Sequence, residues 1–179
     1  MIATGIDDGE LAPGRVSASH WVAALAYLKA RAGADRAMRG WVLGADTVCL
    51  LDGKIVGQPR SREHAGTIIR SFAGRAHEVV TGVALVNADS GDRRFFADVS
   101  VVSLGALGDK DVDSYLDSGL WRGKAGAYNL AERAAAGWPI RCAGDPASVM
   151  GLPLERLVPM LKALGITHKP NTERACCCS

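Results

Sequence analysis

Several signatures that identify common classes of enzyme are missing from this 179-residue sequence. It has no phosphate-binding loop ending in Gly-Lys-Ser or Gly-Lys-Thr, no dinucleotide-binding glycine fingerprint, no cysteine pairs at zinc-ligand spacing and no serine nucleophile elbow. These absences exclude most kinases, dehydrogenases, zinc enzymes and serine hydrolases.

Long runs of like residues are also missing. Basic residues are scattered, the formal net charge is only +2, and no segment approaches the ~20 consecutive apolar residues that a bilayer-spanning helix needs. The acidic beginning, with Asp7, Asp8 and Glu10, is unlike a signal peptide. We therefore expect a cytoplasmic protein with no membrane segment, no nucleic-acid partner and, at most, a small anionic ligand.

The few cysteines do not suggest a disulfide framework. Three of the five are adjacent, Cys176 to Cys178, and Cys49 and Cys142 are expected to be small core residues. With 48% hydrophobic residues, the chain can bury one sizeable core. We therefore predict one domain over residues 1–166 and a disordered tail over 167–179.

Helical and strand patterns alternate along the chain. Helices are predicted from Ser17 or Ser19 to Gly33, over 62–72, from Asp109 or Asp111 to Gly119, and over 153–164, where Pro159 should bend or split the helix. Strands are predicted over 41–51, 54–56, 76–87, 93–104 and 138–143, with turns at 52–53 and 89–92 that form antiparallel hairpins. Residues 119–137 are predicted as a loop followed by one or two helical turns. The pattern predicts an α/β fold with a mixed twisted sheet covered by helices.

One carboxylate interrupts the apolar strand from Trp41 to Leu51. Burying the ionised side chain of Asp46 without a partner would cost several kcal/mol, so it should meet a cation, backbone N–H groups or a cleft open to water. A structural aspartate at a bulge or strand end is the alternative. Gly44 would allow another backbone or a ligand to approach closely.

Other polar residues lie in glycine-rich or apolar surroundings. Lys124 lies between Gly123 and Gly126, where backbone N–H groups can approach an anion and the ammonium supplies a point charge. An ordinary solvated lysine is the alternative there, and a structural histidine is the alternative for His77, which begins a strand. Together with a buried aspartate, these residues are compatible with a phosphate-handling site.

Several short sequence fragments occur in a fixed order along the chain, and this order identifies a family more specifically than any single fragment does. The ordered set comprises 42–48 (Val-Leu-Gly-Ala-Asp-Thr-Val), 57–59 (Gly-Gln-Pro), 77–85, 124–128 (Lys-Ala-Gly-Ala-Tyr) and 149–154, preceded by 6–8 and 25–30. This set resembles the successive motifs of the Maf family, from Gly5 to Ile166. The resemblance implies a Maf/ITPase-like fold with a cleft between two lobes.

The resemblance implies a nucleoside triphosphate pyrophosphatase, which hydrolyses the α–β bond to a monophosphate and pyrophosphate with Mg²⁺ or Mn²⁺. Asp46 would accept a proton or orient water and would bind the metal, with Asp8 as a second metal- or water-directing carboxylate. Thr47 would help to set base preference and Lys124 would neutralise phosphate charge. Relatives of this kind are usually homodimers.

Three departures from the family pattern concern phosphate and base binding. Gln58 replaces the usual lysine, Ala131 stands where a specificity glutamine is expected, and the Ser-x-Ser-Pro-Arg-Arg turn expected before Gly5 is not in the sequence. We therefore expect an N-terminally shortened enzyme with altered substrate choice or reduced rate. The alternatives are a non-catalytic Maf-like module that binds a nucleotide or a partner, and a defective product that lacks its first strand. A misplaced start codon would explain the missing turn but not Gln58 or Ala131.

Overall fold

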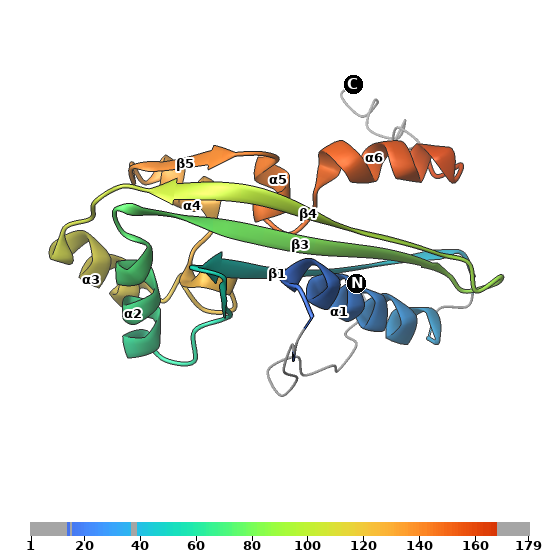
Figure 1. Ribbon diagram of the computed structural model, residues 1–179, viewed down its shortest axis with the longest axis horizontal. Helices are drawn as coiled ribbons and strands as arrows, with labels where there is room; N and C mark the ends of the chain where they lie inside the picture. The colour runs from blue at the N-terminus through green and yellow to red at the C-terminus, as the bar shows by residue number, and fades with distance from the viewer. Residues whose placement is uncertain (1–13, 15, 37–38, 168–179) are drawn as a thin grey trace, which may run out of the picture.

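The protein is built on one five-stranded sheet with helices on both faces (Figure 1). The computed structural model describes residues 14, 16–36 and 39–167. The strands are β1 (Trp41–Leu51), β2 (Lys54–Val56), β3 (Arg75–Asn87), β4 (Arg93–Leu104) and β5 (Ile140–Ala143). The helices are α1 (Ala18–Ala34), α2 (Arg62–Phe72), α3 (Asp109–Ser118), α4 (Leu130–Ala135), α5 (Pro146–Val149) and α6 (Leu154–Ala163), with a short 3-10 turn, η2 (Ala125–Ala127).

The sheet order is β2-β1-β3-β4-β5, and each of its four pairings in the described residues is antiparallel. The helix-covered α/β architecture is confirmed, but the prediction of a mixed sheet was wrong for this part of the chain. The helix α2 does join two strands of the same direction, β2 and β3, as the alternating pattern suggested. However, β1 lies between them, so these two strands never pair.

Local chemistry explains where most elements begin and turn. The side chains of Ser17 and Ser61 accept hydrogen bonds from the backbone N–H groups of His20 and His64, which caps α1 and α2. Asp52 and Gly53 both adopt positive φ, 51° and 73°, as a tight turn between β1 and β2 requires. These predicted caps and the predicted hairpin are therefore confirmed.

The helix α1 lies in direct backbone contact with the sheet. A Cβ atom at Gly82 would lie 2.3 Å from the carbonyl oxygen of Val22, and one at Gly44 would lie 2.3 Å from that of Ala26. Such distances are too short for any side chain, so only glycine allows this approach. The contact fixes the height and rotation of α1 over β1 and β3.

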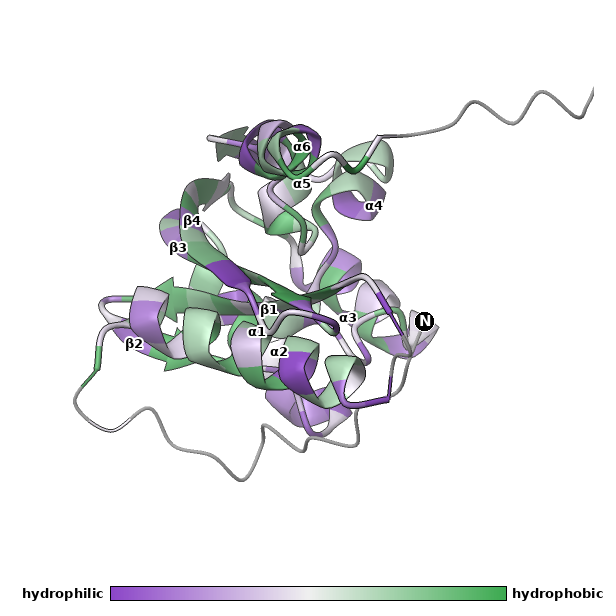
Figure 2. Ribbon diagram, turned by 90° about the vertical axis from the view of Figure 1, so that its right-hand side faces the viewer, coloured by the Kyte–Doolittle hydropathy of each residue, from purple (hydrophilic) through white to green (hydrophobic). Residues whose placement is uncertain are grey.

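The two faces of the sheet carry different helices. Ala84 and Val86 of β3 pack against α1, whereas Val83 and Leu85 pack in the cluster that contains Leu157 of α6. Because neighbouring side chains in a strand point to opposite faces, α1 and α6 lie on opposite sides of the sheet (Figure 2).

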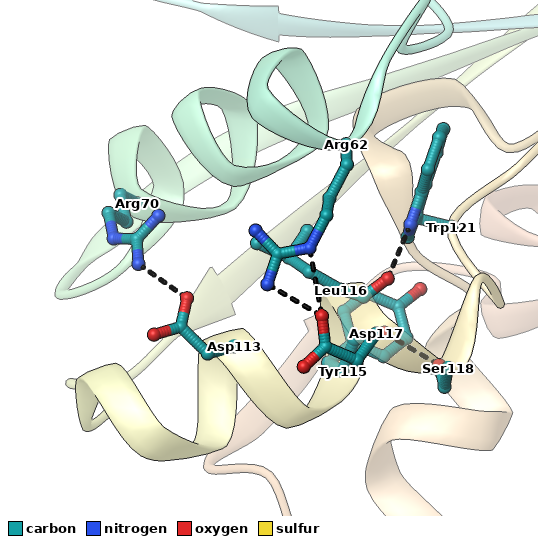
Figure 3. Close-up of polar contacts among 8 residues, drawn as sticks. All are labelled: Arg62, Arg70, Asp113, Tyr115, Leu116, Asp117, Ser118 and Trp121. Carbon is teal, nitrogen blue, oxygen red and sulfur yellow. Dashed lines mark hydrogen bonds and ion pairs between the residues drawn. The ribbon is translucent and has the colours of Figure 1, made fainter.

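The largest core cluster lies at the other end of the sheet, around α2 and α3. There Arg62 and Arg70 of α2 form ion pairs with Asp117 and Asp113 of α3, at 2.6 and 3.1 Å (Figure 3). These pairs are exposed and each contributes at most about 1 kcal/mol, so the buried cluster holds the two helices together.

The C-terminal half differs from the predictions in two features and agrees with them in a third. The helix α5 was not predicted, because its four residues are too few to show a helical period. Pro159 does not split α6, which runs unbroken from Leu154 to Ala163. Residues 119–137 contain η2 and α4, as the predicted loop with one or two helical turns suggested.

Among the described residues, no helix combines the length and the apolar character that a membrane crossing requires. The predicted tail beyond Thr167, the acidic element with Asp8 and the predicted N-terminal shortening lie outside the described residues.

Candidate active site

A cavity of about 270 Å³ lies along the edge of β1. The hairpin strand β2 pairs only with the last three residues of β1, Cys49 to Leu51, which leaves the preceding stretch without a strand on that side in the described part of the chain. Four separate segments supply the lining residues, which are Ala45, Asp46, Thr47, Gln58, Gly123, Lys124, Ala125, Tyr128, Asn129, Val149, Met150 and Gly151. The structure therefore brings four predicted site residues, Asp46, Thr47, Gln58 and Lys124, into one cavity.

Asp46 meets a cation, which is one of the three partners that its position in an apolar strand predicted. Its carboxylate lies 2.5 Å from the Nζ atom of Lys29, and the two side chains are only 9% and 23% exposed. The ammonium compensates the charge of a carboxylate that has lost nearly all of its water. Asp46 also lines the cavity, so this ion pair is placed where a ligand can reach it.

Lys29 was not predicted as a site residue, although the pattern of buried positions on α1 indicates one. On α1 the buried positions are Val22, Leu25, Ala26, Ala30, Gly33 and Ala34. Lys29 falls on the same face, because residues three, four and seven apart share one side of a helix. A lysine inside a buried stripe needs a buried acceptor, and Asp46 is that acceptor.

The hydroxyl of Thr47 is left as a hydrogen-bond acceptor on the cavity wall. The Oγ1 atoms of Thr47 and Thr81 are 2.8 Å apart, and Thr81 donates its own hydrogen to the carbonyl oxygen of Ser148, also at 2.8 Å. Because each hydroxyl has one hydrogen, Thr47 must donate to Thr81. The Thr47 oxygen keeps its lone pairs, so toward a ligand it can only accept.

Lys124 supplies a positive charge to the cavity lining, and its ammonium is held by Glu132 of α4 at 2.5 Å. The turn that carries Lys124 is fixed by a hydrogen bond from the N–H group of Gly126 to the carbonyl oxygen of Gly57, 3.1 Å long. Lys124 is therefore not an ordinary solvated lysine, since it is three-quarters buried and lines the cavity.

Two predicted site residues are not found in the cavity. Ala131 is exposed on α4 and does not line it; the neighbouring Asn129 does. Asn129 caps α4 through its side chain, and the helix that follows turns Ala131 outward. Asp8 lies outside the described residues.

His77 supports the cavity from behind. Its ring stacks on Phe72 with centroids 3.8 Å apart, and its Nε2 atom shares a 2.8 Å hydrogen bond with the hydroxyl of Tyr128, which lines the cavity. Burial lowers the pKa of His77 to about 4, so the ring is neutral at pH 7. The structural role considered for His77 fits this arrangement.

The motifs that converge on the cavity can now be compared with those of known proteins. A family model described as Maf-like protein matches residues 1–164. The chain belongs to the Maf family. This Maf-like chain is 37% identical over 165 residues to a protein of Pelotomaculum thermopropionicum named dTTP/UTP pyrophosphatase, which covers 92% of the chain and 85% of the relative.

Two other relatives carry the same name. The protein of Symbiobacterium thermophilum is 40% identical over 150 residues, covering 83% of the Maf-like chain and 75% of the relative. That of Salinibacter ruber is 38% identical over 156 residues, covering 87% and 76%.

The cavity lining of this Maf-like protein offers a metal ion one carboxylate, that of Asp46. The described residues contain no cluster of three or more histidine, cysteine, aspartate or glutamate side chains that could enclose a cation. However, Mg²⁺ is commonly held by one or two carboxylates together with substrate phosphates and water. Asp46, at the cavity wall, can provide one such carboxylate oxygen.

Proposed function

We propose that this protein is a nucleoside triphosphate pyrophosphatase, which hydrolyses the α–β bond and releases a nucleoside monophosphate and pyrophosphate. The observation that carries the proposal is the buried pair of Asp46 and Lys29 on the wall of a cavity that also contains Lys124. Phosphoanhydride hydrolysis needs an aligned water molecule and neutralisation of phosphate charge. A carboxylate and a nearby lysine can provide both.

Each charged residue has a distinct role in this reaction. Asp46 accepts a hydrogen bond from the attacking water, orients it and takes up its proton. Lys29 holds Asp46 in place and compensates its charge between turnovers. Lys124 stabilises the negative charge of the phosphates as the bond breaks, and it leaves Glu132 to do so.

We further propose that uracil and thymine are the preferred bases, as the names of the relatives suggest. Both bases carry an N3–H donor, whereas cytosine has an acceptor at N3. Because the Thr47 hydroxyl can only accept toward the cavity, it matches the N3–H donor of uracil and thymine and offers no donor to the N3 acceptor of cytosine. Gln58 and Asn129 add neutral polar groups to the lining of the same cavity.

The remaining parts of the proposal concern the setting of the reaction. We propose that Mg²⁺ or Mn²⁺ binds to Asp46, with Asp8 as a second carboxylate, and that the protein acts in the cytoplasm as a homodimer. When bound, the ion would neutralise phosphate charge. The low net charge of +2 and the scattered basic residues favour a small nucleotide over a nucleic acid.

A pyrophosphate-release assay with a panel of nucleoside triphosphates tests the proposal. We expect activity highest with dTTP and UTP, and a loss of about 100-fold or more in kcat for Asp46→Asn, because the water loses its proton acceptor. The matched control is Asp113→Asn, which removes a carboxylate from the exposed α2–α3 ion pair, at a residue that does not line the cavity. Full activity in Asp46→Asn would contradict the assignment, and no release with any nucleotide would favour the non-catalytic alternative.

A further inference from the structure

A second cavity, of about 370 Å³, lies between α3, α4 and the loop that precedes β5. It shares none of its lining residues with the cavity that contains Asp46. Its polar lining includes Arg133, Asp111, Ser114 and Ser118. The two sites are separate, although they are close along the chain.

Arg133 is a buried cation whose Nε–H group has no hydrogen-bonding partner among the described residues. Arg133 is only 8% exposed, and its Nε atom has no hydrogen-bond acceptor among the described residues. Its head group packs instead on two rings, 4.2 Å from the centroid of Tyr115 and 5.3 Å from that of Trp138. Aromatic faces attract the charge of a guanidinium, but they do not satisfy its N–H groups.

The geometry leaves room for one kind of ligand. The rings of Tyr115 and Trp138 meet edge to face, with centroids 5.1 Å apart, and occupy positions over the guanidinium of Arg133. The Nε–H group is left without an acceptor among the described residues, and the N–H groups along one edge of a guanidinium match the oxygen spacing of a carboxylate or phosphate. A buried charge without an opposite charge is costly, so an anion there would stabilise the folded protein.

We propose that this second cavity binds a small oxyanion, a phosphate or carboxylate group, on the guanidinium of Arg133. Ser114 adds a hydroxyl donor at the wall, and the exposed carboxylate of Asp111 sets a limit on affinity by repulsion. The hydroxyl of Tyr115 donates to the carbonyl oxygen of Ala127 at 2.8 Å, so Tyr115 links this second cavity to the turn η2 that follows Lys124. The proposal does not depend on the pyrophosphatase activity.

The test is a titration of the ¹⁵N-labelled full-length protein with inorganic phosphate and, separately, with acetate, at constant ionic strength. The indole N–H signal of Trp138 and the Nε–H signal of Arg133 report on this cavity alone. We expect saturable shifts of both signals with a dissociation constant of about 10 mM or tighter for at least one anion. Response to phosphate only, or to acetate only, identifies the group that binds.

Three variants make the result decisive. Arg133→Gln should abolish the shift of Trp138, and Lys124→Gln should leave it unchanged, because Lys124 belongs to the other cavity. Asp111→Asn, an exposed substitution that preserves Arg133, should tighten binding roughly two- to fivefold by removing a like charge. No saturable shift in the unsubstituted protein, a shift that persists in Arg133→Gln, or equal affinity in Asp111→Asn would overturn the proposal.

Discussion

Because the backbone of α1 packs directly against Gly44 of β1, we predict that Gly44→Ala impairs both stability and activity. The new Cβ atom would lie 2.3 Å from the carbonyl oxygen of Ala26 and 2.6 Å from the backbone nitrogen of Ala30. Ordinary contacts are 3.4 Å or longer, so this part of α1 must move outward by about 1 Å. The displaced turn is the one that carries Lys29.

The cost can be estimated for both stability and catalysis. Overpacking of this kind typically lowers the free energy of unfolding by about 1–3 kcal/mol. A shift of about 1 Å also separates Lys29 from Asp46, and misplacement of that size can reduce kcat/KM on the order of 100-fold. Urea denaturation and pyrophosphate release measure the two effects on the same sample.

Gly82→Ala is the matched comparison. Its Cβ atom would lie 2.3 Å from the backbone of Val22, two turns of α1 away from Lys29. We expect a similar loss of stability but a smaller loss of activity. If Gly44→Ala is as stable and as active as the unsubstituted protein, the backbone of α1 does not pack against Gly44 of β1.

The remaining predictions concern single side chains near the cavity. Burial lowers the pKa of His77 from its ordinary value of 6.5 to about 4, so below pH 6.5 the unfolded chain binds a proton at His77 that the folded protein does not. The free energy of unfolding, measured by urea denaturation, should therefore fall by about 2 kcal/mol between pH 7.5 and pH 5.0. His77→Gln should lose most of this pH dependence. Glu132→Gln removes the counterion of Lys124 and should lower KM for the nucleotide roughly two- to fivefold, and an unchanged KM would show that the pair does not oppose binding. Thr47→Val should reduce the preference for UTP over CTP about tenfold in kcat/KM, and a preference that survives would place base selection elsewhere.

Local sequence signals predicted most of the elements. Serine caps at Ser17 and Ser61, the Asp52-Gly53 turn and the positive-φ stop at Gly119 each act over a few residues, so their effect can be predicted without tertiary information. Strand order depends on contacts between distant segments. For that reason the hairpins were predicted correctly, and the insertion of β1 between β2 and β3 was not.

The same distinction applies to the site. Asp46, Thr47, Gln58 and Lys124 were predicted from unusual local surroundings and from the family resemblance, and the structure brings them together. Lys29 was missed because its importance depends on which strand α1 covers. The second cavity likewise depends on the meeting of α3 with α4, which no local pattern reveals.

The packing of α1 on Gly44 and Gly82 also depends on the correct register between β1 and β3. In the native pairing Gly82 lies opposite Asp46, and Gly44 lies opposite Ala84. A slip of β1 by a single residue would turn its side chains to the other face, and Asp46 would then point away from the helix that brings its lysine. Misaligned chains would therefore lack both the docking surface for α1 and the ion pair between Asp46 and Lys29. Correct sheet assembly and catalytic activity should then appear together during folding.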